Sequence, residues 1–218
     1  KNFSYQQICC KVMHLFTDID EETLGPLIDN AFAQFPSPDP FPMTSVDNVI
    51  LLDLSNGPTL AFKDIGQQVV AQLLHHFLSL RNTLTNATAS GDCGQSLVKA
   101  NIMIDTSGDT GPAAIAGVKN SPYIDISVLY PDGRTSAVQE LQMITVLNPN
   151  VHVYRCEGNN DDQSSVLKEI FSDEGFVREN NVCSINSINW ARIAAQSTYY
   201  VWAYLQVRPP RCAGGYAL

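Results

Sequence analysis

Patterns that mark several common functional sites are missing from this sequence. The six cysteines include no C-x-x-C pair, and the four histidines include no H-E-x-x-H segment. Because zinc sites are usually built from such closely spaced ligands, we expect no metal site of this kind. Neither G-x-G-x-x-G nor G-x-x-x-x-G-K-[ST] occurs, which argues against a general α/β nucleotide-binding protein.

Positive charge and long apolar runs are also scarce. The chain has 13 basic and 22 acidic residues, a formal net charge of -9, and its basic residues form no stripe with interleaved aromatics. This distribution argues against a nucleic-acid partner. No apolar run approaches the roughly 20 residues that a membrane-spanning helix needs, so we expect no membrane partner either.

What the chain does have is enough apolar sequence for a sizeable core, at 44% of 218 residues. It starts at Lys1 rather than at a methionine and stops just after Gly214-Gly215, so we expect a fragment or a processed product. The scattered cysteines suit a reducing, cytoplasmic compartment. We expect Cys156 and Cys183 to be small core residues, and the Cys9-Cys10 pair to be unreactive on a helix.

Strands and helices alternate from residue 48 onward, which predicts an α/β fold with an open, mostly parallel sheet and helices on both faces. Before that point, residues 3–17 and 20–35 predict two helices, and four prolines make 36–47 an extended connector. The polar segment 82–96 predicts a surface insertion. We therefore divide the chain into 1–47, a core over 48–207, and a tail over 208–218. The expected strands are 48–54, 100–105, 123–130, 151–156 and 182–185, and the expected helices of the core are 61–84, 110–119, 135–147, 164–172 and 190–207.

Lys63 is the most informative residue, because it lies at a predicted strand-to-helix junction beside Phe62 and small residues. Partial desolvation there disfavours the ammonium form and lowers the pKa of the amine. A neutral amine is what a lysine needs to form an imine with an aldehyde cofactor. A surface lysine at an ordinary helix start is the alternative reading of this residue alone.

Three polar segments follow predicted strands, at 56–64, 106–111 and 184–189. Ligands of open α/β sheets bind beyond the carboxyl ends of the strands, so the three segments can meet in one crevice. Each could also be ordinary: a turn with a helix cap at Thr59, a tight strand-to-helix loop at 106–111, and a capped helix start at 186–189. Together they offer an amine, a glycine-opened helix start and short hydroxyl and amide side chains, which suits an anionic small molecule. Residues 90–94 nearly repeat 107–111, but only the second copy follows a strand and opens a helix.

Long segments of the chain resemble the threonine synthase family and, within it, the animal threonine synthase-like proteins. The resemblance rests on G-P-T-L-A-F-K-D at 57–64, T-S-G-D-T-G-P-A-A at 106–114, V-L-Y-P-D-G-R-T-S-A-V-Q-E-L-Q-M-I-T-V at 128–146 and N-S-I-N-W-A-R-I at 186–193. It covers about residues 20 to 206. It implies the tryptophan-synthase β type of pyridoxal-phosphate fold (fold type II), here incomplete.

The resemblance also implies roles for individual residues. Lys63 would bind pyridoxal 5'-phosphate through an imine and then move protons on the substrate. The remaining cofactor-binding residues would be Ser107, Gly108, Asp109, Thr110 and Asn186. The substrate-binding residues would be Asn56, Thr106, Ser187, Asn189 and Arg192, with Arg192 beside an anionic group.

The implied reaction is elimination of phosphate from a phosphorylated amino acid, such as O-phosphohomoserine or phosphothreonine. A homo-oligomer is a further expectation. Two departures from the family stand out: Asn56 replaces a usual histidine, and the tail 208–218 resembles the segment that follows the cofactor-phosphate loop, as if the loop had been skipped. We expect a lower cofactor affinity for that reason. The alternative is a catalytically inactive, truncated form that acts as a binding or secreted signalling protein.

Overall fold

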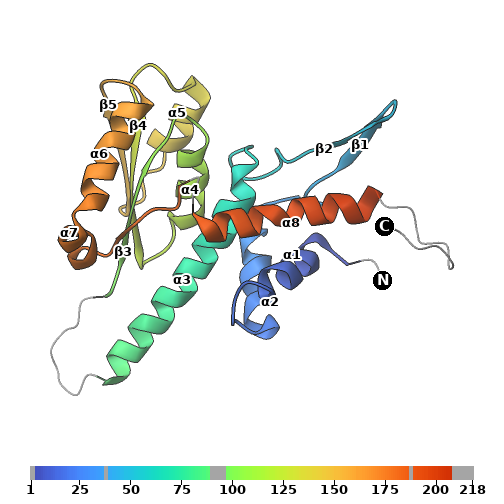
Figure 1. Cartoon of the computed structure of the whole chain (residues 1–218), viewed down its shortest axis with the longest axis horizontal. Coiled ribbons are helices and arrows are strands. Elements are labelled where there is room, and N and C mark those ends of the chain that lie inside the picture. Colours follow the sequence, from blue (N-terminus) through green and yellow to red (C-terminus); the bar gives the residue numbers. More distant parts are fainter. Residues whose placement is uncertain (1–2, 37–38, 89–96, 187–188, 208–218) are drawn as a thin grey trace.

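The computed structural model describes residues 3–36, 39–88, 97–186 and 189–207. A long helix, α3 (Lys63–Thr88), runs between a parallel sheet with its helices and a group of amino-terminal helices (Figure 1). The first residue of this helix is Lys63. The residue predicted to carry the chemistry therefore lies where the two parts of the molecule meet.

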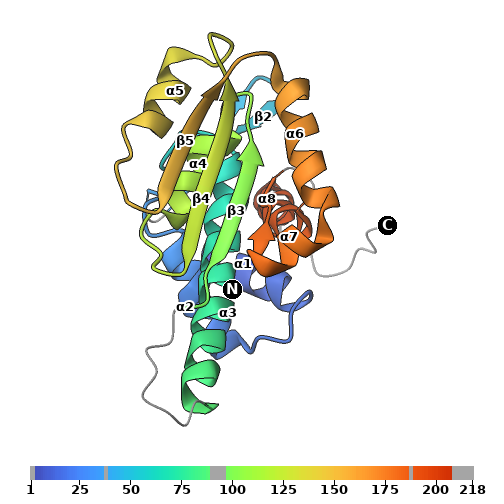
Figure 2. The same cartoon turned by 90° about the vertical axis from the view of Figure 1, so that its left-hand side faces the viewer.

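The sheet has four parallel strands in the order β5-β4-β3-β6. In β4, Ile124, Ile126 and Val128 are fully buried and alternate with partly buried residues, as the period of a strand requires. Helices α4 and α5 cover one face and α6 covers the other (Figures 1 and 2). The predicted α/β fold is confirmed. The strands are β3 (Ala100–Asp105), β4 (Ile124–Pro131), β5 (Val151–Cys156) and β6 (Val182–Cys183), and the helices are α4 (Thr110–Val118), α5 (Ala137–Ile144), α6 (Asn160–Ser172) and α7 (Glu174–Glu179).

The amino-terminal helices pack on α3 and on α8 (Trp190–Val207) rather than standing apart. Tyr5 of α1 (Tyr5–His14) is fully buried, with edge-on contacts to Phe32 and Phe41. Asp20 accepts a bond from the Thr23 amide and so caps α2 (Glu21–Ala31), as predicted. One apolar cluster thus joins α1, α2, α3 and α8 and fixes the start of α3.

The segment before α3 differs from the prediction. β1 (Met43–Val46) and β2 (Val49–Leu52) pair as an antiparallel hairpin that is separate from the parallel sheet. Asp47 adopts a positive φ of 52°, which suits the two-residue turn between these strands. The expectation of an extended connector through residue 47 is wrong. A strand was predicted at 48–54, and β2 lies within that range, but it pairs with β1 outside the parallel sheet, and its first three residues are exposed.

Other elements also begin or end at residues that differ from the prediction. Helix α3 continues to Thr88, so 82–88 belongs to a helix and not to a surface insertion. Helix α6 begins four residues earlier than predicted, and α7 was not predicted at all. The first near-repeat, 90–94, lies outside the described residues. Cys9 and Cys10 are both buried, whereas Cys156, expected in the core, is only partly buried because β5 is an edge strand of the sheet.

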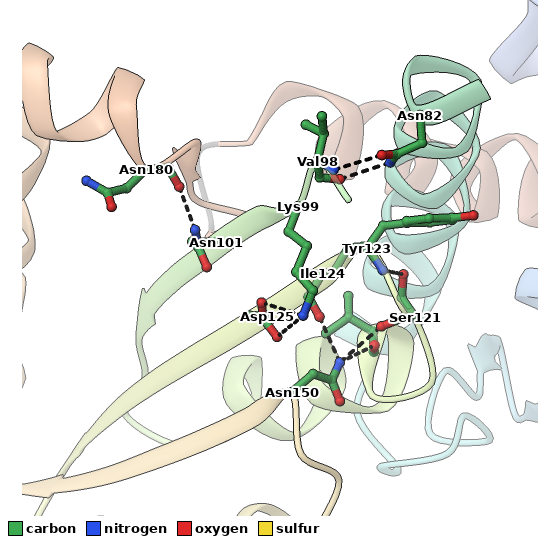
Figure 3. Close-up of polar contacts among 11 residues, drawn as sticks. Asn82, Val98, Lys99, Asn101, Ser121, Tyr123, Ile124, Asp125, Asn150 and Asn180 are labelled. Carbon is green, nitrogen blue, oxygen red and sulfur yellow. Dashed lines mark hydrogen bonds and ion pairs between the residues drawn. The ribbon is translucent and has the colours of Figure 1, made fainter. Parts of the chain in front are cut away.

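Side chains tie the amino ends of the strands to the neighbouring helices (Figure 3). Asn82 of α3 accepts a bond from the Val98 amide at 2.7 Å and donates to its carbonyl at 3.0 Å. Asn150 donates to the carbonyl of Ile124 at 2.8 Å, and Lys99 pairs with Asp125 at 3.0 Å. These contacts stabilise the amino ends of the strands. The predicted crevice lies at the opposite, carboxyl ends.

Candidate functional site

The amine of Lys63 lies among polar atoms from α4. Its Nζ is 2.7 Å from Asp109 Oδ1 and 2.8 Å from Thr110 Oγ1, and the side chain is 18% exposed. Lys63 is therefore sheltered, and it also has an acidic partner that the sequence did not predict.

The loop before Lys63 is fixed by contacts to both backbone groups of Thr59. Asp64 accepts from the Thr59 amide at 2.9 Å and from its hydroxyl at 2.7 Å. Gln142 of α5 donates to the Thr59 carbonyl at 3.0 Å. A Cβ added at Gly57 would lie 2.4 Å from Asp64 Oδ2, so only glycine allows this approach. Thr59 is therefore more than a helix cap, because its hydrogen bonds to Asp64 and Gln142 hold the loop in place.

Asp64 is a fully buried carboxylate with no lysine or arginine in ion-pair contact among the described residues. Burial raises its pKa above the ordinary value, and the bonds from Thr59 oppose that shift. A buried carboxyl group that accepts bonds from an amide and a hydroxyl rigidifies the segment around it. The backbone thus holds Lys63 in one position at the start of α3.

The loop between β3 and α4 is closed by Thr106. Its hydroxyl oxygen accepts bonds from the amides of Gly108 and Gly111, both at 3.1 Å. A Cβ added at Gly108 would lie 2.6 Å from Gln139 Oε1, so α5 packs directly on this loop. Asp109 precedes α4 but makes no capping bond with its side chain, which instead faces Lys63.

The third polar segment leads into α8. Asn186 donates to Asp105 Oδ1 at 2.7 Å. Asn189 accepts from the Arg192 amide at 3.1 Å and donates to the Ser184 carbonyl at 3.2 Å, so it also caps the helix. Ser187 lies outside the described residues.

Arg192 is buried at the contact between α8 and α3. It is 6% exposed, and a Cβ added at Gly66 of α3 would lie 2.7 Å from its Cγ. Burial lowers the pKa of its guanidinium, and the nearby charge of Asp109 opposes that shift. Its expected role against a substrate anion stays a prediction that the geometry does not favour.

A cavity of about 690 Å³ brings the three segments together beside α6. This volume is typical of sites for small molecules and cofactors. Of the predicted site residues, Asn56, Gly108, Asp109 and Arg192 are not among those that line it. The predicted residues that do are Lys63, Thr106, Ser107, Thr110, Asn186 and Asn189.

Sequence reasoning missed one wall of this cavity. Helix α6 contributes side chains at positions 160, 164, 167, 168 and 171, which share one helix face. Asp105 at the end of β3 was also missed; it is 7% exposed and accepts bonds from Ser164 and Asn186. The helical spacing of the α6 residues shows in the sequence that they share one face of a helix. The sequence does not indicate that this face lines a cavity.

The described part of the chain contains no group of three or more histidine, cysteine, aspartate or glutamate side chains that could hold a metal ion. None of its helices combines the length and apolar character that a membrane crossing needs.

Comparison with known proteins gives clear similarities. No model of a known protein family matches the chain. It is 38% identical over 211 residues to threonine synthase of Schizosaccharomyces pombe, which covers 95% of this chain and 40% of that protein. It is also 38% identical over 210 residues to threonine synthase-like 2 of Mus musculus, with 94% and 40% covered. The chain therefore spans about 40% of the length of these relatives.

Solved structures give the same result. Threonine synthase from Brucella melitensis, crystallised with PLP bound, matches with a TM-score of 0.82 and 34% identity over 96% of this chain and 43% of that one. The yeast enzyme matches with a TM-score of 0.80 and 36% identity, over 94% and 40%. Diaminopropionate ammonia lyase from Escherichia coli, at 14% identity and a TM-score of 0.54, shares the fold alone.

Proposed function

We propose that this chain, a homologue of the threonine synthases over nearly its whole length, holds pyridoxal phosphate at Lys63 and eliminates phosphate from a phosphorylated amino acid. The observation that carries the proposal is the sheltered amine of Lys63, which lines a cavity of about 690 Å³. When bound, pyridoxal phosphate supplies an electron sink for the reaction. The work of the protein is to orient the groups, to place charge and to move protons.

The residues present fit the reactive part of this cofactor. A covalently attached aldehyde needs a primary amine at the cavity wall, and Lys63 provides one. A ring with polar substituents needs hydrogen-bonding side chains nearby, and Ser107, Thr110 and Asn186 provide them. Residues 208–218, which the resemblance places just after the cofactor-phosphate loop, lie outside the described residues.

Asp109 has a direct part in the proton chemistry that we propose. The nitrogen of Lys63 must lose a proton before it can bond to a carbonyl carbon. Asp109 Oδ1, at 2.7 Å, is within the distance at which a general base acts. Thr110 holds the same nitrogen from a second direction at 2.8 Å. The ion pair thus keeps the amine in place and provides an acceptor for its proton.

The proposed substrate is O-phosphohomoserine or phosphothreonine. Its support is the similarity to threonine synthases together with a cavity that combines cationic and small polar side chains. Phosphate is a far better leaving group than hydroxide, so elimination needs a positioned proton acceptor more than a strong acid. Lys63 is the group that would carry a proton between substrate atoms.

Borohydride reduction after incubation with pyridoxal phosphate tests the proposal. We expect one stable cofactor adduct, mapped by mass spectrometry to Lys63, and release of inorganic phosphate from O-phosphohomoserine or phosphothreonine. Lys63→Ala should abolish both, and Lys11→Ala, at an exposed lysine of α1, should abolish neither. A wild-type chain that stays unlabelled at Lys63 and releases no phosphate would overturn the proposal in favour of a non-catalytic binding protein.

A further inference from the structure

One face of α6 forms a cavity wall that the proposed function does not yet use. The face consists of Asn160, Ser164, Leu167, Lys168 and Phe171. Their steps of three and four residues keep all five side chains on the same side of the helix. The wall is therefore a continuous surface with both polar and apolar members, and it belongs to the same cavity as Lys63.

The two basic side chains that line the cavity differ in whether they are ion-paired. Lys63 and Lys168 are its two basic residues among the described part of the chain. Lys63 is paired with Asp109, whereas Lys168 forms no ion pair with another described residue. The acidic member of the lining, Asp105, accepts hydrogen bonds from Ser164 and Asn186. The positive charge of Lys168 is thus available to a ligand.

A second group on the same face also lacks a partner. The side-chain oxygen of Asn160 is buried and has no hydrogen-bond partner in the described part of the chain. Turning the amide by 180° exchanges this oxygen for an NH₂ donor, since the two orientations of an asparagine amide have nearly the same shape. Buried polar groups are normally satisfied, so an unpaired one in a cavity wall points to a polar ligand.

We propose that the α6 face is the subsite for the distal phosphate of the amino-acid substrate, with Lys168 as its phosphate-binding residue. Leu167 and Phe171, on the same face, would pack against the carbon chain of the ligand. A compact ammonium on a flexible stem suits a phosphate monoester, which carries most of the negative charge of such a substrate. This inference rests on the proposed function, because it takes the amino group of the ligand to lie at Lys63.

The same geometry explains why Arg192 is not the residue proposed here. Arg192 is buried against Gly66 and does not line the cavity. Lys168 is solvent-exposed in the cavity wall and can move without disturbing the core. In a chain with a formal net charge of -9, a cation at the wall also counters the general repulsion of anions.

Binding of O-phosphothreonine and of threonine to the cofactor-loaded chain, measured by calorimetry, tests the inference. The wild type should bind the phosphorylated ligand more tightly. Lys168→Ala should weaken O-phosphothreonine binding about tenfold or more, as expected for a lost charge-assisted contact, and should leave threonine binding unchanged. Lys168→Arg should retain most of the preference. Lys11→Ala, which removes the same charge far from the cavity, should behave as wild type, and thermal melting should show that every variant is folded.

Two results would overturn the subsite. One is a Lys168→Ala variant that prefers O-phosphothreonine as strongly as the wild type, and the other is an equal loss of both ligands. Borohydride labelling of the same samples separates this outcome from failure of the proposed function. If Lys63 is labelled in the wild type and in Lys168→Ala while the phosphate preference is unchanged, the subsite alone is wrong. If Lys63 is not labelled in the wild type, the proposed function is wrong.

Discussion

Thr59 shows how single hydrogen bonds position the Lys63 side chain four residues away. Its amide and hydroxyl bind Asp64, and its carbonyl binds Gln142 from α5. The next residue, Leu60, adopts a positive φ of 62°, which a leucine rarely does. A strained residue persists only where its surroundings hold it, so these contacts balance the strain.

Gln142→Ala is therefore expected to loosen the loop that carries Lys63. Losing the 3.0 Å bond to Thr59 should lower the free energy of unfolding by about 1 kcal/mol. It should also slow the labelling of Lys63 by pyridoxal phosphate and borohydride, because the amine is less well placed. Denaturant unfolding and mass spectrometry measure the two effects. Leu141→Ala, at an exposed neighbour on α5, is the control, and an unchanged labelling rate in Gln142→Ala would show that Gln142 does not position Lys63.

Cys9 offers a prediction that depends on pH. Its side chain is fully buried, and burial raises the pKa of the thiol from 9.0 to about 12. At pH 8 only about one thiol in ten thousand would be ionised, and the thiolate is the reactive form. We expect iodoacetamide to leave Cys9 unmodified at pH 8 in the folded chain and to modify it in urea. Cys156, which is partly buried on β5, should react in the folded chain; rapid modification of Cys9 there would contradict its packing in α1.

The candidate site was predictable only where a residue type is itself informative. Lys63 and the segment 106–111 could be singled out because each follows a predicted strand, where ligands of open α/β sheets bind. Asp105 could not be singled out, because an aspartate at the end of a strand is common. Its partners, Ser164 and Asn186, also lie far from it in the sequence. The contact between Lys63 and Asp109 was not predicted, because the two residues lie 46 positions apart in the sequence.

The packing of α3 against α8 depends on one glycine. A Cβ added at Gly66 would lie 2.7 Å from Arg192 Cγ and 2.9 Å from the Arg192 carbonyl oxygen. The second contact involves backbone, so the two helices must separate to accept a side chain.

Gly66→Ala should therefore destabilise the chain although alanine favours helix. Overpacking of this kind costs about 1–3 kcal/mol, which exceeds the roughly 1 kcal/mol that alanine gains over glycine inside a helix. Thermal and urea unfolding should show the net loss. Thr83→Ala, at an exposed position of the same helix, is the control and should change stability by less than about 0.5 kcal/mol. A Gly66→Ala variant as stable as the wild type would mean that the two helices are not packed this closely.

Among the secondary structure elements, the parallel strands were the most predictable. β3 and β4 are apolar runs that are buried in the sheet, and each precedes a helix in the sequence. The β1–β2 hairpin was missed because Pro36, Pro40 and Pro42 suggested one extended connector, and Asp47-Asn48 was not recognised as its turn. The apolar run 49–52 predicted a strand, and only tertiary structure could show that Val49, Ile50 and Leu51 are exposed.

The whole molecule leaves apolar surface on two elements that extend away from the sheet (Figure 1). On the hairpin, Val49, Ile50 and Leu51 are 57%, 46% and 54% exposed. On the carboxyl half of α8, Tyr200 and Leu205 are 66% and 48% exposed. Contiguous exposed apolar residues, above all on a strand edge, favour association with another chain. A homo-oligomer remains a prediction, and this surface is where we expect it to form.

Ile50→Lys combined with Leu51→Lys should therefore reduce self-association of the chain. The two charges would have to be buried at an apolar contact between copies, which is costly, whereas in the monomer they point into solvent. Sedimentation velocity over a range of protein concentrations should show a species larger than the monomer for the wild type and mainly monomer for the variant, with unchanged far-ultraviolet circular dichroism. Leu147→Lys, at a residue that is 89% exposed on the loop after α5, supplies a matched control and should associate as the wild type does. If the wild type is monomeric at every concentration, the exposed hairpin does not serve association between copies of this chain.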